Sequence, residues 1–197
     1  TSYGIFGEAY LEINDRIKLT AGIRYNNDEK SVRARSTLAS FLAPYSSTNA
    51  FDSPFFGAFD ADPGTAGVQG IQERSTSTGE FTGRAVIDWK VTDDNLLYAS
   101  YSRGYKSGGI NPPLQPIFEV PEAFAPEFVN AFEIGSKNQF ANGALTLNLT
   151  AFYYQYNSLQ LARIVARTAV NDNVDADIYG GGAAAIIRAS RVLHIQL

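Results

Sequence analysis

The chain has 197 residues, 45% of them hydrophobic, and a net charge of −4, which supplies enough apolar material for a folded domain. It contains no cysteine, and this excludes disulfide scaffolds, thiol catalysis and zinc sites that use cysteine. The sequence has no run of about 18 apolar residues, so no membrane helix is predicted. Its basic residues are dispersed, which gives no support to nucleic-acid binding. Met and a signal-peptide pattern are also absent, so we expect a fragment of a longer protein.

The first residues alternate apolar with polar side chains, which is the pattern of a β-strand with one apolar face. We predict a strand over about residues 2–13 and a second strand that starts at Ile17. Asn14, Asp15 and Arg16 lie between them, and short Asn and Asp side chains favour a tight turn because they bond to nearby backbone. A slip of one residue would exchange the two faces, so the register of this pair is strongly specified.

Two more strand pairs follow the same pattern. The first covers about residues 80–91 and continues from Leu97 after the polar turn 92–95. The second runs over residues 132–154 and turns at Asn142-Gly143, a strong hairpin signal because both residues tolerate positive φ. A seventh strand is predicted to begin near Asp175. No amphipathic helix is predicted among these strands, so the fold class is all-β.

Long connections separate the strand pairs. Residues 31–73, 106–126 and 158–174 are rich in Gly, Pro, Ser and Asn, and a compact soluble domain rarely has loops beyond about 15 residues unless they are functional. Short and long connections therefore alternate. This alternation is typical of an antiparallel transmembrane β-barrel, with short periplasmic turns, long extracellular loops, an apolar face toward lipid and a polar face toward the lumen.

The aromatic and the charged side chains agree with this assignment. Trp89 and Tyr153 suit the interface between lipid and water. A soluble antiparallel sheet also alternates apolar with polar residues, so periodicity leaves a soluble β-sheet domain, enzymatic or lectin-like, as an alternative. The charged residues predicted on the lumen face are Glu8, Arg24, Arg84, Asp88, Glu133 and Lys137.

Several segments resemble one known family. LYASYSRGYKSGGIN over residues 97–111, FAPE over 124–127 and FEIGSKNQF over 132–140 are similar to consecutive parts of the barrel of TonB-dependent outer-membrane receptors. GALTLNLTAFYY over residues 143–154 continues the match, and GIFGEAYLEINDRIKLTAGIRYNNDEK near the start resembles an earlier hairpin of that barrel. Each segment alone is a weak signal, whereas their order and spacing together are specific.

The resemblance implies a barrel of about 22 strands whose lumen is plugged by an N-terminal domain. Residues 1–180 would then supply about seven of those strands, and neither the plug nor the TonB box is in this sequence. The implied function is energy-coupled uptake of a scarce nutrient, above all a ferric siderophore, across the outer membrane of a Gram-negative bacterium. The implied partners are outer-membrane lipid, a TonB complex acting through the missing N-terminal region, and the small-molecule ligand. A passive porin or adhesin barrel is the alternative, and neither enzymatic activity nor a cofactor is expected.

Residues 181–197 depart from the family pattern, because alternation is lost there and helical propensity rises. We expect a frameshift, a truncation or a fragment end to account for this divergent tail. It includes His194, which is the one histidine of the chain and has no carboxylate neighbour in the sequence.

Other motifs are weak. Asp172, Asp175 and Asp177 lack the spacing and central glycine of an EF-hand calcium loop. Residues 104–109 are rich in glycine, but no helix follows them to bind phosphate. Residues 148–150 match a glycosylation sequon inside a predicted strand, and no spacing supports a glycosidase pair of carboxylates.

Ligand contacts are harder to predict. Aromatic and cationic residues of the long loops suit ferric siderophores, which are often anionic and aromatic, but the same side chains also pack loops together. We therefore assign no catalytic, cofactor, metal or ligand-binding residue. The candidates that this chemistry favours are Tyr45, Phe55, Phe56, Tyr105, Lys106 and Arg163.

Overall fold

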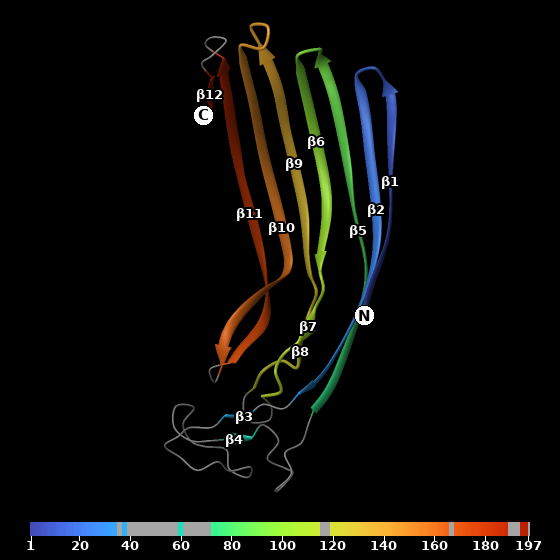
Figure 1. The fold of residues 1–197 in the computed structure, drawn as a ribbon, viewed down its shortest axis with the longest axis vertical. Helices are drawn as coiled ribbons and strands as arrows, with labels where there is room; N and C mark the ends of the chain where they lie inside the picture. The colour runs from blue at the N-terminus through green and yellow to red at the C-terminus, as the bar shows by residue number, and fades with distance from the viewer. Residues whose placement is uncertain are drawn as a thin grey trace.

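A computed structural model describes residues 1–34, 37–38, 59–60, 72–114, 119–165, 168–188 and 194–196. These residues form one antiparallel sheet of eight strands in the order β1-β2-β5-β6-β9-β10-β11-β12 (Figure 1). Two further pairs, β3 with β4 and β7 with β8, lie in the long connections. The bounds of the main strands are β1 Ser2–Asn14, β2 Ile17–Ala34, β5 Gln72–Thr92, β6 Asn95–Lys106, β9 Glu127–Phe140, β10 Leu145–Val165, β11 Thr168–Arg188 and β12 His194–Gln196. The short strands are β3 Thr37–Leu38, β4 Phe59–Asp60, β7 Gly109–Ile110 and β8 Ala123–Phe124.

The sheet is long and gently curved, with short turns at one end and long connections at the other (Figure 1). We call these the turn end and the outer end. The prediction of an all-β fold is confirmed. Within the described ranges, no helix is long and apolar enough to cross a membrane.

The predicted tight turns form for the expected local reasons. The side-chain oxygen of Asn14 accepts hydrogen bonds from the backbone N–H groups of Arg16 and Ile17, both at 2.9 Å. Between β9 and β10, positive φ is confirmed at Asn142 (55°) and Gly143 (82°), but Ala141 also has a φ of 52°. The turn is therefore longer than the predicted two-residue hairpin, and β9 and β10 begin to pair at Phe140 and Leu145.

One face of the sheet is apolar and uncovered. Its large side chains are exposed, with 62% exposure for Ile134, 44% for Leu149 and 80% for Tyr179. The buried hydrophobic residues of the described chain are Leu114, Val120 and Val170, and these do not cover that face. A soluble sandwich would bury one face against a second layer. The exposed apolar face instead fits the lipid-facing side of a barrel.

An aromatic row crosses this apolar face. Tyr101, Phe132, Tyr153 and Tyr179 are direct partners across β6, β9, β10 and β11. The ring centroids of Tyr101 and Phe132 are 5.0 Å apart, and those of Phe132 and Tyr153 are 6.4 Å apart. Trp89 lies near the turn end of the same face, 47% exposed. A row of aromatic side chains on an apolar face is typical of the interface between lipid and water in membrane barrels.

The opposite face is polar and internally bonded, as the alternation predicts. The Arg84 guanidinium donates two hydrogen bonds to the Glu8 carboxylate, both 2.9 Å long. Further along the sheet, the Tyr98 hydroxyl donates to Glu133 at 2.7 Å and lies 3.2 Å from the Thr150 hydroxyl. Gly135 leaves the space for this tyrosine, since an added Cβ would lie 2.6 Å from the Tyr98 ring.

The strands extend farther toward the outer end than the alternation predicts. The sequence assigned residues 31–73 and 158–174 to loops, yet β2 and β5 pair as far as Ala34 with Gln72, and β10 and β11 pair as far as Val165 with Thr168. The predicted start of the seventh strand near Asp175 is wrong for the same reason. Hydrogen bonds between backbones hold these extensions, and beyond the lipid neither face needs apolar residues, so the pattern fades while the pairing continues.

The start of the divergent tail is also a strand. Residues 181–188 belong to β11, where Gly182 pairs with Thr150 and Ile187 with Leu145, and β12 follows. The helical propensity of this segment does not determine its structure, because backbone pairing with β10 holds the small Gly and Ala residues extended. The sheet therefore has eight strands where seven were predicted. The side chain of His194 lies outside the part of the chain that the structure describes.

Candidate functional site at the outer ends of the strands

The connection between β6 and β9 folds over the outer end of the sheet. Its described parts, residues 107–114 and 119–126, include the small hairpin of β7 and β8. β7 contacts β2 and β5, whereas β8 contacts β11. One connection therefore contacts β5 on one side and β11 on the other, although β6, β9 and β10 lie between these two strands in the sheet.

Asn111 is heavily hydrogen-bonded within the described part of this connection. Its side chain is 1% exposed, and its carboxamide nitrogen donates to the carbonyls of Pro121 (3.0 Å) and Asn171 (2.9 Å). Its carboxamide oxygen accepts from the backbone N–H of Asn171 at 2.8 Å, and its own backbone N–H donates to the Glu122 carbonyl at 2.9 Å. The carboxamide thus pairs with Asn171 as a peptide group of a neighbouring strand would.

A small apolar cluster lies beside this carboxamide. Leu114 and Val120 come from the connection and Val170 comes from β11, and they are 1%, 3% and 0% exposed. Val165 of β10 packs against them. Asn111 is itself buried, and hydrogen bonds that are shielded from water are more costly to break than exposed ones.

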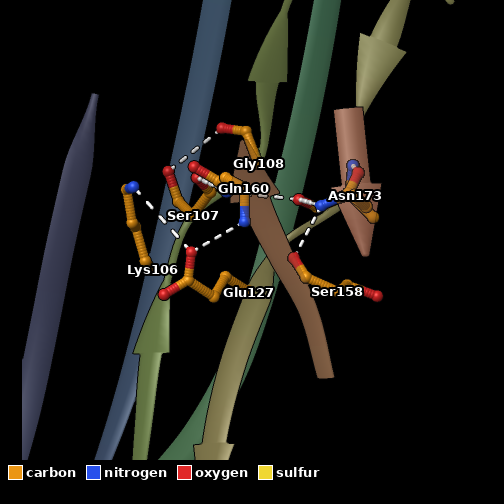
Figure 2. Close-up of polar contacts among 8 residues, drawn as sticks. Lys106, Ser107, Gly108, Glu127, Ser158, Gln160 and Asn173 are labelled. Atoms are coloured by element: carbon orange, nitrogen blue, oxygen red, sulfur yellow. Dashed lines mark hydrogen bonds and ion pairs between the residues drawn. The ribbon is translucent and has the colours of Figure 1, made fainter. Parts of the chain in front are cut away.

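A second group of polar contacts joins the connection to β10 and β11 (Figure 2). The backbone N–H of Gln160 donates to Glu127 at 2.9 Å, and its carboxamide donates to the carbonyls of Ser107 (3.0 Å) and Ala125 (3.2 Å). The side chain of Asn173 accepts from the Ala125 N–H at 2.7 Å and donates to the Ser158 carbonyl at 2.7 Å. Ser158, with a φ of 58°, lies at a bulge of β10.

Three contacts fasten the connection and the end of β6 to β2 and β5. Lys30 donates to the Gly108 carbonyl at 2.6 Å, and Arg74 lies 3.0 Å from the Glu122 carboxylate. The Tyr105 hydroxyl donates to Asp28 at 3.0 Å. Burial, followed by this hydrogen bond to a carboxylate, raises the pKa of Tyr105 to about 12, so the phenol stays protonated at neutral pH.

The predicted ligand candidates are partly placed. Tyr45, Phe55 and Phe56 lie outside the described residues. Tyr105, Lys106 and Arg163 do lie at the outer end, but each has a carboxylate partner on its own chain: Asp28 for Tyr105, Glu127 at 3.9 Å for Lys106, and Asp172 for Arg163.

The structure separates the acidic residues that were weighed as calcium ligands. Asp172 binds Arg163, Asp175 accepts from the Ser158 N–H at 2.8 Å, and Asp177 accepts from the Tyr153 hydroxyl at 3.0 Å. Among the residues that the structure describes, no group of three metal-binding side chains is brought together. The sequence did not single out Asn111, Gln160 or Asn173, although an Asn before two prolines in a long connection is a recognisable turn signal.

The chain matches one protein family along nearly its whole length. The family model described as TonB dependent receptor-like, beta-barrel, matches residues 1–184. No curated protein matches the sequence.

Solved structures of two receptors and a metal transporter share the fold. The ferric yersiniabactin uptake receptor FyuA from Yersinia pestis superposes with a TM-score of 0.68 at 17% identity, over 96% of this chain and 24% of that chain. The siderophore receptor PiuA from Acinetobacter baumannii gives 0.60 at 18% identity, over 96% and 23%. The copper transporter OprC gives 0.61 at 18% identity, over 96% and 27%. The chain spans about a quarter of the length of these structures.

Proposed function

The chain belongs to the TonB-dependent receptor β-barrel family, and from this premise we propose that it forms part of an outer-membrane receptor for energy-coupled uptake of a scarce nutrient. The observation that carries the proposal is the match over residues 1–184, on a sheet with one apolar face and one polar face. In this proposal the apolar face contacts outer-membrane lipid, and the polar face lines the lumen.

We propose a ferric siderophore as the nutrient. FyuA is a ferric yersiniabactin receptor and PiuA is a siderophore receptor, which supports this class of ligand, while OprC is a copper transporter. Each of the three is described by a metal or by a siderophore, which is a molecule that chelates iron. The ligand would approach from the outer end, where the long connections lie.

The remaining parts of the receptor belong to the same proposal. Residues 1–180 supply barrel strands, a plug and a TonB box are encoded elsewhere in the complete gene, and a TonB complex couples uptake to the inner membrane. Residues 181–197 are a divergent tail in this division, although the family match continues to residue 184.

Deletion of the complete gene, followed by uptake of radiolabelled ferric siderophores by iron-limited cells, tests the proposal. We expect the deletion strain to lose uptake of at least one siderophore and to regain it with the gene on a plasmid. Uptake of every siderophore at the parental rate, together with lost uptake of cobalamin or a glycan, would reject the iron assignment and keep the receptor.

Energy coupling distinguishes the receptor from a passive barrel. Uptake through a TonB-dependent receptor stops when TonB is deleted, whereas diffusion through a porin continues. Uptake that is unchanged in cells without TonB would therefore reject the receptor proposal.

A further inference from the structure

The described parts of the β6–β9 connection, residues 107–114 and 119–126, form one internally bonded body, which we call the strap. Its two arms pair as β7 and β8. The backbone N–H of Asn111 continues this pairing with a 2.9 Å hydrogen bond to the Glu122 carbonyl, and the Asn111 carboxamide donates to the Pro121 carbonyl at 3.0 Å. Because the arms are bonded to each other, the strap can move as a unit.

Apolar side chains hold one side of the strap. Leu114 and Val120 of the strap form a buried cluster with Val170 of β11, and Val165 of β10 packs against it. Burial of apolar side chains is the main favourable term in folding, and it does not depend on charge. The strap is therefore firmly seated on β10 and β11.

Charged side chains hold the other side of the strap to β2 and β5. The Lys30 ammonium donates to the Gly108 carbonyl at 2.6 Å, and the Arg74 guanidinium lies 3.0 Å from the Glu122 carboxylate. Both strands are interior strands of the sheet, so these contacts do not depend on its edges. The Glu122 side chain is 59% exposed, and ion pairs that solvent reaches contribute little to stability. We therefore expect this side to open before the apolar side.

Lys30 and Arg74 both belong to the polar face of the sheet. Strand side chains alternate between the two faces, and an even number of residues separates Lys30 from Arg24 on β2 and Arg74 from Arg84 on β5. Arg24 and Arg84 are among the charged residues predicted for the lumen face. The strap thus lies over the polar face at the outer end.

We propose that the strap is a lid, hinged on β10 and β11 and latched to β2 and β5 by Lys30 and Arg74. Release of the latch separates the strap from the polar face of β2 and β5. The motion breaks no strand pairing between the two halves of the sheet, because β5 pairs with β6 only as far as Gly83 with Arg103. The role of the lid rests on the proposed function, in which the polar face lines the lumen: release widens the outer entrance of that lumen for the ligand.

Cysteine labelling of the complete receptor, purified from outer membranes and free of other cysteines, measures opening. Thr76 lies on the same face of β5 as Arg74 and is partly buried, whereas Ser77 lies on the opposite face and is exposed. Fluorescein maleimide should therefore label Thr76→Cys more slowly than Ser77→Cys. Glu122→Gln removes the charge that pairs with Arg74, and it should make labelling of Thr76→Cys about threefold to fivefold faster because the strap is open for more of the time.

The matched control is Glu73→Gln. It breaks the ion pair between Glu73 and Arg33, which is also 3.0 Å long and joins the same two strands on the opposite face. Labelling of Thr76→Cys should stay at the parental rate in this variant. Lys30→Met, which removes the other latch contact, covers the case in which Glu122→Gln does not assemble, and it should raise the rate by a similar factor. A parental rate in the latch variants, or an equal increase in Glu73→Gln, would overturn the latch.

A covalent lock tests the role of the lid in uptake. Arg74→Cys and Glu122→Cys in one receptor, joined by a short bismaleimide, replace the ion pair by a permanent bridge. The bridged receptor should lose most of its siderophore uptake in iron-limited cells, while each single-cysteine variant treated with the same reagent keeps it. Full uptake by the bridged receptor would overturn the lid. Absence of uptake by the parent receptor would instead count against the proposed function, and the labelling rates would then decide on the latch alone.

Discussion

The assignment of faces in β11 can be tested with two neighbouring alanines. Ala183 pairs with Leu149 on the apolar face, and Ala184 pairs with Asn148 on the polar face. Substituting each by Arg introduces the same charge into the same residue type, one position apart. The segment is also where the sequence loses its alternation, so the structure alone decides which alanine faces lipid.

The position of Ala183 sets the expected cost. It lies four residues from the aromatic row at Tyr179 and four from Ile187, near the turn end. At about 3.3 Å per residue this is about 13 Å along the strand in each direction, and a tilt of about 40° reduces it to about 10 Å of depth. Ala183 is therefore near the middle of the apolar band, where Arg costs about 2–4 kcal/mol.

Guanidinium unfolding of the complete receptor in lipid vesicles, followed by circular dichroism, measures this cost. Ala183→Arg should shift the folding equilibrium roughly 30-fold to 700-fold toward the unfolded state. Ala184→Arg should leave the midpoint close to the parental value, because its side chain enters a polar environment. Equal destabilisation by both variants, or a larger effect of Ala184→Arg, would refute the assignment of faces.

Three further predictions concern single positions. Gly135→Ala should lower the free energy of unfolding by about 1–3 kcal/mol because the added Cβ meets the facing tyrosine ring of β6 at 2.6 Å, whereas Gly182→Ala, with nothing within 4 Å, should have little effect; equal midpoints would contradict this. Gly143→Ala should lower the same quantity by about 1 kcal/mol, since its φ is +82°, and an unchanged midpoint would show that the turn adapts without strain. Asp28→Asn should lower the pKa of Tyr105 from about 12 toward its ordinary value, as seen in the ultraviolet titration of parent and variant. A phenol pKa that is raised in the folded state stabilises the fold fully below about pH 10, and this stabilisation is lost as the pH rises toward 12. Asp28→Asn should therefore also reduce the loss of stability between about pH 10 and 12. Identical titrations of parent and variant would argue against the Asp28 contact.

The sequence predicts the membrane-facing part of the sheet well because lipid imposes a chemical rule there. The positions of β1 and β10 that face lipid must carry apolar or small side chains, so alternation reports both strand and face. Beyond the aromatic row the rule ends. Residues 159–165 of β10 and 168–174 of β11 pair through backbone hydrogen bonds with the Arg163–Asp172 ion pair beside them, and their side chains show no alternation from which the pairing can be inferred.

The candidate site was predictable only in its chemistry. The sequence places aromatic and cationic residues in long connections, and Tyr105, Lys106 and Arg163 do lie at the outer end. It does not show that Asn111 meets Asn171, because 60 residues separate them and a neutral carboxamide leaves no periodic signal. The contact depends on where β11 places Asn171 beside the β6–β9 connection, which is known only once the register of β10 and β11 is known.

The existing partners rank the ligand candidates. A siderophore that binds through Tyr105 must displace Asp28, whose carboxylate accepts a 3.0 Å hydrogen bond from this half-buried phenol, so Tyr105 is better placed to hold the outer end together than to bind a ligand. Lys106 lies 3.9 Å from Glu127 with its side chain 63% exposed, and an exposed pair at that distance contributes little to stability. An anionic ligand can therefore recruit the Lys106 ammonium at almost no cost to the fold. Arg163, 49% exposed and paired with Asp172 at the end of the β10–β11 hairpin, is intermediate between the two.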